Sequence, residues 1–219
     1  RVFHLDYVPL PGGDAAVRNP GRMALAYLHH ACLQWDADLP PVTEYSSTEL
    51  SLIQRQIEKH INSPLTSSMG RLFDAVSALL GNCQHVSYEG QAAIELESLA
   101  DYAEEDYYPI DLQSRIIDVR PLWECLVRDI RKGITTAQLA ARFHNSIAQL
   151  GLQVCENLRS QTGIDQVALS GGVWQNIFLL TRTIALLQSR GFTPLIHRRV
   201  PANDGGITLG QAVIASFYQ

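Results

Sequence analysis

The sequence predicts an α/β fold, because two strand patterns that end in glycine turns follow a long series of helix patterns. Gln166-Val167-Ala168-Leu169 is typical of a buried strand, and the tight turn Ser170-Gly171-Gly172 separates it from a helix pattern. Residues 193–197 are typical of a second strand, and a second glycine turn over 201–206 precedes the last helix pattern. Strands and helices that alternate in this way place the chain in the α/β class.

The composition is that of an ordinary globular protein and narrows the range of partners. The 219 residues, of which 46% are hydrophobic and 18% charged, can bury one substantial core or two small ones. The net charge of −5 is spread along the chain without a run of Lys or Arg, so no long nucleic acid is expected as a partner. A small anionic ligand is compatible with this charge.

Several targeting and scaffold signals are missing from the sequence. It has no apolar stretch of about 20 residues and no basic-then-apolar leader, so neither a membrane partner nor a signal peptide is expected. The four cysteines form no C-x-x-C pair, which argues against a zinc ribbon or disulfide framework and favours the cytoplasm. Because the first residues resemble a strand in mid-course and no Met stands in front, we expect a fragment of a longer chain.

Helix patterns dominate the first 135 residues. After a Pro- and Gly-rich loop, Asn19-Pro20 supplies an N-cap and a proline at the first helical position for a helix over 23–33. Ser46 and Glu49 form a capping box ahead of an amphipathic helix that Asn62-Ser63-Pro64 ends. The other elements predicted here are helices over 69–80 and 89–103, a strand over 115–119 and a helix that Pro121 opens.

The rest of the chain contains the two strands and is predicted to be an α/β subdomain. Its helices are predicted over 135–160, 174–189 and 207–217. The sequence therefore predicts an entry strand and loop over 1–19, a mainly helical subdomain over 20–135 and an α/β subdomain over 136–219. No solenoid repeat or low-complexity tract is apparent.

The two glycine turns are the most informative features for chemistry. Each precedes a helix, where unpaired backbone N–H groups and the helix dipole favour an anion, and glycine lets a ligand approach the backbone closely. The alternative is that they only make room for a bend. Neither turn matches the Walker A or G-x-G-x-x-G pattern.

Two aspartates have positions that suggest a role. Asp204 lies in the second turn, where it could hold a cation or bond to its own backbone. Asp74 lies in an apolar helix face and needs a partner if buried, which could be a ribose hydroxyl pair or Arg71, unless it faces solvent. His29, His30 and His144 lack metal-ligand spacing and are interpreted as structural or surface residues.

Taken together, the motifs resemble the C-terminal part of the carbamoyltransferase HypF family. The matching stretches follow the family's order over nearly the whole chain: 9–16 (PLPGGDAA), 67–81 (SSMGRLFDAVSALLG), 87–97 (SYEGQAAIELE), 141–145 (ARFHN), 169–176 (LSGGVWQN) and 203–211 (NDGGITLGQ). The resemblance implies the C-terminal portion of an actin/sugar-kinase/Hsp70-like domain, with a ribonuclease-H-like α/β core and a largely helical insert.

The resemblance also implies a set of site residues. Asp74 matches an aspartate that binds ribose, Glu95 a carboxylate of the nucleoside pocket, and Asn176 an asparagine that faces the nucleoside. Gly171 and Gly172 would let the nucleotide approach, and Gly70 and Gln91 fall in the matching nucleotide-binding stretches. Asp204 matches a metal-ligand aspartate, but the family's other metal ligands are histidines of an H-x-x-x-H motif that this chain does not contain. No catalytic residue is assigned.

In the family, carbamoyl phosphate and ATP yield a carbamoyl-adenylate, whose carbamoyl group passes to the C-terminal cysteine of the partner HypE. The resemblance therefore implies ATP, a divalent metal (Fe, Zn or Mg) and a HypE-like acceptor protein for the parent enzyme, and an incomplete reaction for a fragment. Two alternatives are a kinase-like fragment that phosphorylates a small metabolite and a non-catalytic interaction module. The first predicts phosphoryl transfer that does not depend on carbamoyl phosphate, and the second predicts no nucleotide affinity.

Overall fold

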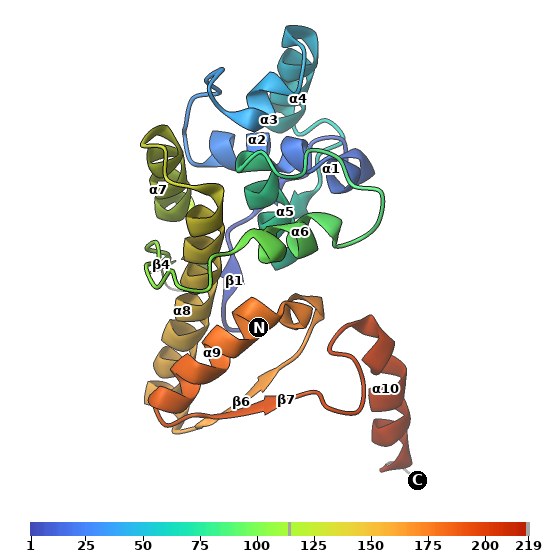
Figure 1. Ribbon diagram of the computed structural model, residues 1–219. Helices are drawn as coiled ribbons and strands as arrows, with labels where there is room; N and C mark the ends of the chain where they lie inside the picture. The colour runs from blue at the N-terminus through green and yellow to red at the C-terminus, as the bar shows by residue number, and fades with distance from the viewer. Residues whose placement is uncertain (114, 218–219) are drawn as a thin grey trace. The chain divides into compact units, whose positions relative to one another are not determined.

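The computed structural model describes residues 1–113 and 115–217, which separate into two compact units (Figure 1). Unit 1 comprises Arg1–Ser146 and unit 2 comprises Ile147–Gln219. The boundary falls within the long helix α8 (Thr136–Thr162). Both units combine strands with helices, as the predicted class requires, whereas the subdomain limits at 19 and 135 stay predictions.

Unit 1 surrounds a small sheet with helices. Its sheet has the order β1-β5-β4, with β1 parallel to β5 and β4 antiparallel to it, and β2 and β3 form a separate antiparallel pair. The strands are β1 (His4–Leu5), β2 (Val8–Pro9), β3 (Leu65–Thr66), β4 (Asp111–Gln113) and β5 (Ile116–Asp118). The helices before α8 are α1 (Asp14–Arg18), α2 (Pro20–His30), α3 (Pro40–Thr43), α4 (Ser47–Lys59), α5 (Met69–Leu79), α6 (Gln91–Leu99) and α7 (Arg120–Arg131).

The core of unit 1 lies between α2 and α5. Both helices are apolar over most of their length, so each buries almost its whole surface against its neighbours. Tyr27 of α2 stacks on Trp123 of α7 with ring centroids 5.2 Å apart. Phe73 of α5 meets Phe143 of α8 edge to face at 4.8 Å. Helix α5 ends where Gly81 takes up a φ of +76°, as the sequence predicts.

The predicted capping box at the start of α4 is confirmed. Ser46 Oγ accepts a hydrogen bond from the Glu49 amide at 3.4 Å, and the Glu49 carboxylate accepts one from the Ser46 amide at 2.9 Å. Ser46→Ala removes the first of these, so we expect the free energy of unfolding to fall by about 1 kcal/mol. Urea denaturation measures this change. Ser51→Ala is the matched control, because its hydroxyl bonds only to the Ser47 carbonyl inside the same helix and we expect little effect.

Two predicted helix starts are wrong in detail. The Asn19 side chain does not cap α2; its Nδ2 donates instead to the Ala15 carbonyl at 2.6 Å, because the short helix α1 ends there. The helix predicted over 89–103 is shorter, since Gly90 is left-handed (φ +81°) and α6 begins only at Gln91. At its other end α6 stops at Leu99, and residues 100–110 form an irregular segment.

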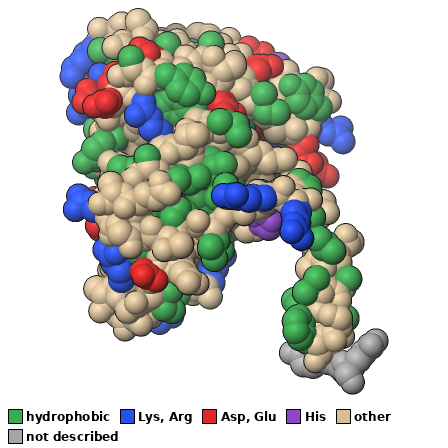
Figure 2. Space-filling model, turned by 60° about the horizontal axis from the view of Figure 1, so that its bottom comes forward, with side chains coloured by type: hydrophobic (Ala, Val, Ile, Leu, Met, Phe, Trp, Pro, Cys, Tyr) green, Lys and Arg blue, Asp and Glu red, His purple; other side chains and the backbone are tan. Residues whose placement is uncertain are grey.

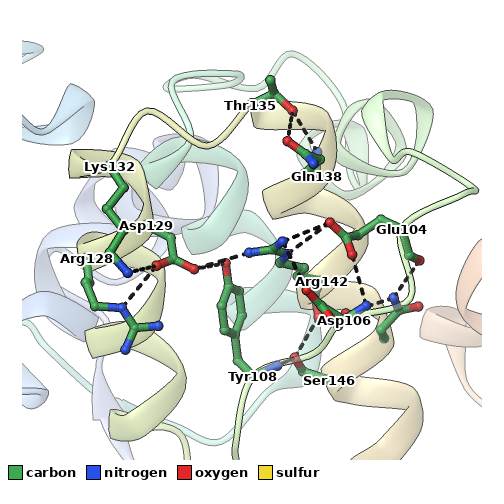
Figure 3. A network of polar contacts seen from close by, with 11 residues as sticks. Glu104, Asp106, Tyr108, Arg128, Asp129, Lys132, Thr135, Gln138, Arg142 and Ser146 are labelled. Carbon is green, nitrogen blue, oxygen red and sulfur yellow. Dashed lines mark hydrogen bonds and ion pairs between the residues drawn. The ribbon is translucent and has the colours of Figure 1, made fainter.

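This irregular segment is fastened to α7 and α8 by a polar network (Figure 3). Arg142 of α8 lies within 3.0 Å of Glu104, 3.2 Å of Asp106 and 3.4 Å of Asp129. Asn145 donates to the carbonyl oxygens of residues 104 and 106, both at 3.0 Å. Ser146 Oγ accepts from the Tyr108 amide at 2.7 Å. The ARFHN stretch of the sequence therefore holds the segment to the helices.

Unit 2 has a two-stranded parallel sheet, whose strands β6 (Gln166–Leu169) and β7 (Thr193–Ile196) pair in the register Leu169↔Ile196. The helix predicted over 174–189 is interrupted: residues Gly172–Gln175 form the 3-10 turn η1, and α9 (Ile177–Ser189) begins after Asn176. A small core lies between α8, the end of β6, α9 and the residue that precedes β7. It consists of Leu152, Leu169, Leu187 and Phe192.

The last helix, α10 (Ile207–Ser216), follows the 3-10 turn η2 (Asp204–Gly206) and confirms the predicted helix over 207–217. None of its residues is buried, and hydrophobic side chains lie along it on the face shown in Figure 2. The large exposed ones are Ile207, Leu209, Val213 and Ile214. Of the helices that the structure describes, none combines the length and the apolar character needed to cross a bilayer.

Candidate functional site

Asp74 lies on the buried face of α5, and the structure gives it a charged partner. Only 4% of the residue is exposed, and its Oδ2 lies 2.9 Å from Nη1 of Arg71, one turn earlier on the same helix. Of the partners considered from the sequence, Arg71 is therefore the one present, and a solvent-facing Asp74 is wrong. The nucleoside role of Asp74 is a separate matter and stays a prediction.

The surroundings of Asp74 make its charged form costly. Burial raises the pKa of its carboxyl to about 6, and the carboxylate of Glu89 adds to this, while the Arg71 guanidinium acts in the opposite direction. Tyr27, from α2, is fully buried and senses the charges of both Arg71 and Asp74. Its hydroxyl has no hydrogen-bond partner among the described residues. A buried carboxylate with a pKa raised towards neutral pH, together with a buried hydroxyl that lacks a hydrogen-bond partner, is typical of functional sites.

Gln91 and Glu95 are brought together on α6. Gln91 Nε2 donates to Glu95 Oε1 at 2.8 Å, and Gln91 Oε1 accepts from the Ser87 amide at 2.8 Å. The amide of Gln91 thus fixes both the Glu95 carboxylate and the turn ahead of α6. Spacing of four residues on one helix made this contact predictable.

Cys83 interacts electrostatically with both Glu95 and Asp74. Burial raises the pKa of its thiol to about 11, and the charges of Glu95 and Asp74 add to this. Sequence reasoning missed this residue, because Cys83 lies in an irregular turn after α5 and no helical or strand spacing relates it to either carboxylate. Gly70 lies four residues before Asp74 on α5, and a Cβ built on it would meet only Ser68 Oγ, at 3.6 Å. Gly70, Asp74, Gln91 and Glu95 thus all belong to unit 1.

Gly171, Gly172, Asn176 and Asp204 belong to unit 2, at the carboxyl end of the β6–β7 pair. Gly171 has a φ of +107°, and its amide donates to the Ala202 carbonyl at 2.8 Å, which joins the two predicted glycine turns. A Cβ on Gly171 would meet nothing within 4 Å, so the backbone conformation, not close packing within the chain, requires glycine there. The open side of the turn leaves room for a ligand.

Beside this turn, the loop after β7 contributes a polar pair that the sequence did not reveal. His197 Nε2 lies 3.0 Å from Ser170 Oγ. The two residues follow the paired positions Leu169 and Ile196, so the parallel register brings them together. Only the strand pairing could have predicted this contact, since 27 positions separate the two residues.

Two asparagines, Asn176 and the neighbour of Asp204, cap the elements that follow them, which the sequence did not predict. Asn176 is largely buried and caps α9, because its Oδ1 accepts from the Leu179 amide at 2.7 Å. Asp204 is the exposed first residue of η2, and Asn203 caps that turn by accepting from the Gly205 amide at 3.1 Å. Within residues 1–113 and 115–217, no group of three or more His, Cys, Asp or Glu side chains could hold a metal ion. Asp204 could therefore supply one ligand but not a complete metal site.

Comparison with known proteins gives consistent matches over nearly the whole chain. Residues 1–211 match the family described as "Carbamoyltransferase, Kae1-like Domain, second subdomain". The chain is 36% identical over 96% of its length to the carbamoyltransferase HypF of Synechocystis sp., of which it covers 29%. It is 40% identical over 99% of its length to the carbamoyltransferase HypF of Rhodobacter capsulatus, of which it covers 28%.

Two solved structures have the same fold. A full-length HypF in the phosphate- and nucleotide-bound form superposes with a TM-score of 0.91 at 41% identity, over 98% of this chain and 28% of that one. The HypF of T. kodakarensis gives a TM-score of 0.85 at 28% identity, over 100% of this chain and 30% of that one. The chain thus spans less than a third of the length of each of these four relatives.

Proposed function

Because this chain belongs to the carbamoyltransferase HypF family, we propose that it holds the nucleotide in an ATP-dependent carbamoyl transfer carried out by the intact protein. In this reaction carbamoyl phosphate and ATP form a carbamoyl-adenylate. The carbamoyl group then passes to the C-terminal cysteine of a HypE-like acceptor, as a step towards the cyanide ligand of NiFe hydrogenase. The family's name supports a carbamoyltransferase, and the acceptor and the adenylate are part of the proposal.

The observation that carries the proposal is the Asp74 group of unit 1. A ribose presents two neighbouring hydroxyl donors, and an ionised carboxylate can accept both. Asp74 supplies a buried carboxylate, Gln91 and Glu95 supply an amide and a second carboxylate that bond to each other, and a Cβ on Gly70 would meet only Ser68 Oγ. A solved full-length relative, which superposes with a TM-score of 0.91, is described as nucleotide-bound, and this supports a nucleotide ligand for the family.

In unit 2, the open Gly171-Gly172 turn and Asn176 are proposed to contact the nucleotide, and Asp204 to supply one ligand of a divalent cation (Fe, Zn or Mg). Such a cation would neutralise phosphate charge. No group of three or more possible ligands is present among the described residues, so further ligands would come from elsewhere in the intact protein. No step of the transfer is assigned to the cation.

The chemistry requires little of this chain beyond binding and orientation. A carbamoyl-adenylate is a mixed anhydride, so attack by the acceptor thiolate forms a C–S bond to the carbamoyl carbon and breaks the C–O bond to phosphate, with AMP as the leaving group. Asp74 and its neighbours would hold the ribose of AMP, which fixes the carbonyl carbon relative to the incoming sulfur. No residue of the chain is assigned as an acid, base or nucleophile.

Titration calorimetry of ATP into the intact protein tests the nucleotide site, with and without a divalent metal. Asp74→Asn keeps the shape of the side chain but replaces one acceptor oxygen by an amide donor, so we expect at least about tenfold weaker binding. Asp36→Asn is the matched control, because this exposed carboxylate pairs only with Arg131 at the surface. Equal affinity of the wild type and Asp74→Asn would contradict the assignment of Asp74.

Product analysis distinguishes the proposed transfer from the two alternatives. Carbamoyl transfer predicts AMP formation that depends on carbamoyl phosphate, whereas a small-metabolite kinase predicts ADP without it. An interaction module predicts neither product and no ATP affinity. AMP formation that requires both carbamoyl phosphate and the acceptor thiol is the expected result.

A further inference from the structure

We propose that Arg71 is a positioning residue for nucleoside recognition: its guanidinium keeps the buried Asp74 carboxylate ionised and holds it in place to accept the ribose hydroxyls. This inference rests on the proposed nucleotide site. It concerns a residue that would not need to touch the nucleotide and acts through Asp74.

The geometry of the pair is unusual for an i,i+3 contact on a helix. Such pairs ordinarily lie on solvated surfaces and contribute little. Here the Arg71 side chain is 16% exposed and that of Asp74 6%, with 2.9 Å between Nη1 and Oδ2. Arg71 Nη1 is buried and makes no hydrogen bond of good geometry, so the contact is primarily an attraction between charges. An attraction between charges in a poorly solvated place is strong and sets the ionisation of the partner.

The other groups around Asp74 all oppose its ionisation or leave it unchanged. Glu89 contributes a like charge, and Cys83, with the Glu95 carboxylate beside it, lies close enough to sense Asp74. Helix α2 presents Tyr27, which stays neutral because burial raises the pKa of its hydroxyl. Helix α3 presents no titratable side chain. Arg71 is thus the single favourable charge for Asp74 within the part of the chain that is described.

The consequence for binding follows from hydrogen-bond capacity. An ionised carboxylate accepts from both hydroxyls of a ribose, whereas a protonated one must use one oxygen as a donor. With its pKa near 6, Asp74 is mostly ionised at neutral pH in the presence of Arg71. Without the guanidinium, burial and Glu89 would act unopposed, so the pKa of Asp74 would rise and the protonated fraction at neutral pH would increase.

The test is the pH profile of ATP affinity in the intact protein, together with the titration of the Asp74 carboxyl by carboxyl-carbon NMR, assigned with Asp74→Asn. For Arg71→Met, the Asp74 midpoint should move to higher pH. ATP affinity should fall about tenfold at about pH 7 and recover towards about pH 9. Arg71→Lys keeps the charge and should bind within about threefold of the wild type. Arg131→Met, which removes a surface guanidinium, should leave both readouts unchanged.

Four results would overturn the inference. The first is an Asp74 titration midpoint in Arg71→Met that equals the midpoint in the wild type. The second is a loss of ATP affinity that is the same at every pH and that Arg71→Lys also shows, because such a loss indicates a structural role. If Arg71→Met does not fold, Arg71→Gln takes its place, and the same results are expected for it. Absence of ATP binding by the wild type overturns the nucleotide site itself and this role with it, whereas wild-type binding that Arg71→Met leaves intact overturns the role of Arg71 alone.

Discussion

Arg142→Met is expected to lower the free energy of unfolding of unit 1 by about 3 kcal/mol, because it removes the cation shared by two nearly buried carboxylates. The side chains of Glu104 and Asp129 are only 10% and 7% exposed, and the Arg142 guanidinium lies between them (Figure 3). Asp129 keeps contacts with Arg128 and Lys132, so the expected loss is at the lower end for a broken buried pair.

Urea denaturation of the variant measures this loss, and hydrogen exchange locates it. The Tyr108 amide, which donates to Ser146 Oγ, should exchange faster in Arg142→Met, because the segment 100–110 loses its main anchor. Arg131→Met is the control: its guanidinium pairs with Asp36 and Asp38 at the surface, where solvent screens the charges, so little change is expected. A denaturation midpoint like that of the wild type would show that the network contributes no net stability.

The second large effect expected is a steep acid loss of stability in Asp74→Asn that the wild type does not show. His144 is fully buried against Phe73, and its Nδ1 donates to the Ala140 carbonyl at 2.7 Å. Burial lowers the pKa of His144 to about 4, with the Ala140 hydrogen bond acting in the opposite direction. Its contribution to stability is therefore present above about pH 6.5 and is lost as the pH falls towards 4.

Asp74 changes stability in the opposite direction over the same range. Because its folded pKa is raised to about 6, its contribution is fully present below the ordinary aspartate value and is lost as the pH rises through 6. Between about pH 7 and 4.5 the two contributions largely cancel in the wild type, each being on the order of 2 kcal/mol. Asp74→Asn removes one of them, so its free energy of unfolding should fall by about 2 kcal/mol over this range.

Urea denaturation at several pH values tests the cancellation. The double variant Asp74→Asn with His144→Leu is the control, and its stability should again change little between about pH 7 and 4.5. The carboxylates with lowered pKa values, Asp38, Glu49, Asp118 and Asp129, are the same in the wild type and in both variants and do not disturb the comparison. Parallel pH profiles for the wild type and Asp74→Asn would contradict the opposing roles of the two buried groups.

The sequence predicted the elements whose signals are local. The capping box at Ser46, helix α5 with its stop at Gly81, strand β6 and helix α10 all follow from spacing or from one special residue, and the structure confirms them. The predicted burial of β6 is wrong, because only Leu169 of its four residues is buried. The motif set also identified the HypF family, and the family match over residues 1–211 and the superposition at a TM-score of 0.91 confirm this and the fold class. The site residues stay predictions until a ligand is measured.

One failed prediction depended on contacts distant in sequence and another on a local contact. The predicted helix over 89–103 ends early because Arg142 and Asn145, some forty positions later, hold residues 104 and 106 in an irregular segment. Asn19 was predicted to cap α2, but the unpredicted helix α1 brings the Ala15 carbonyl within reach of its side chain. The early end of α6 cannot be obtained from local propensity, because tertiary hydrogen bonds outweigh it.

The sequence by itself determined that Asp74 lies on an apolar helix face, that Arg71 stands one turn before it and that glycine turns follow the strands of unit 2. Only the tertiary structure decided that Asp74 is buried, that the charge of Glu89 and the thiol of Cys83 interact with it and that Ser170 meets His197 across two strands. The physical reason is that spacing along a chain fixes which face a side chain occupies, whereas its solvation and its electrostatic neighbours depend on the segments that pack against that face.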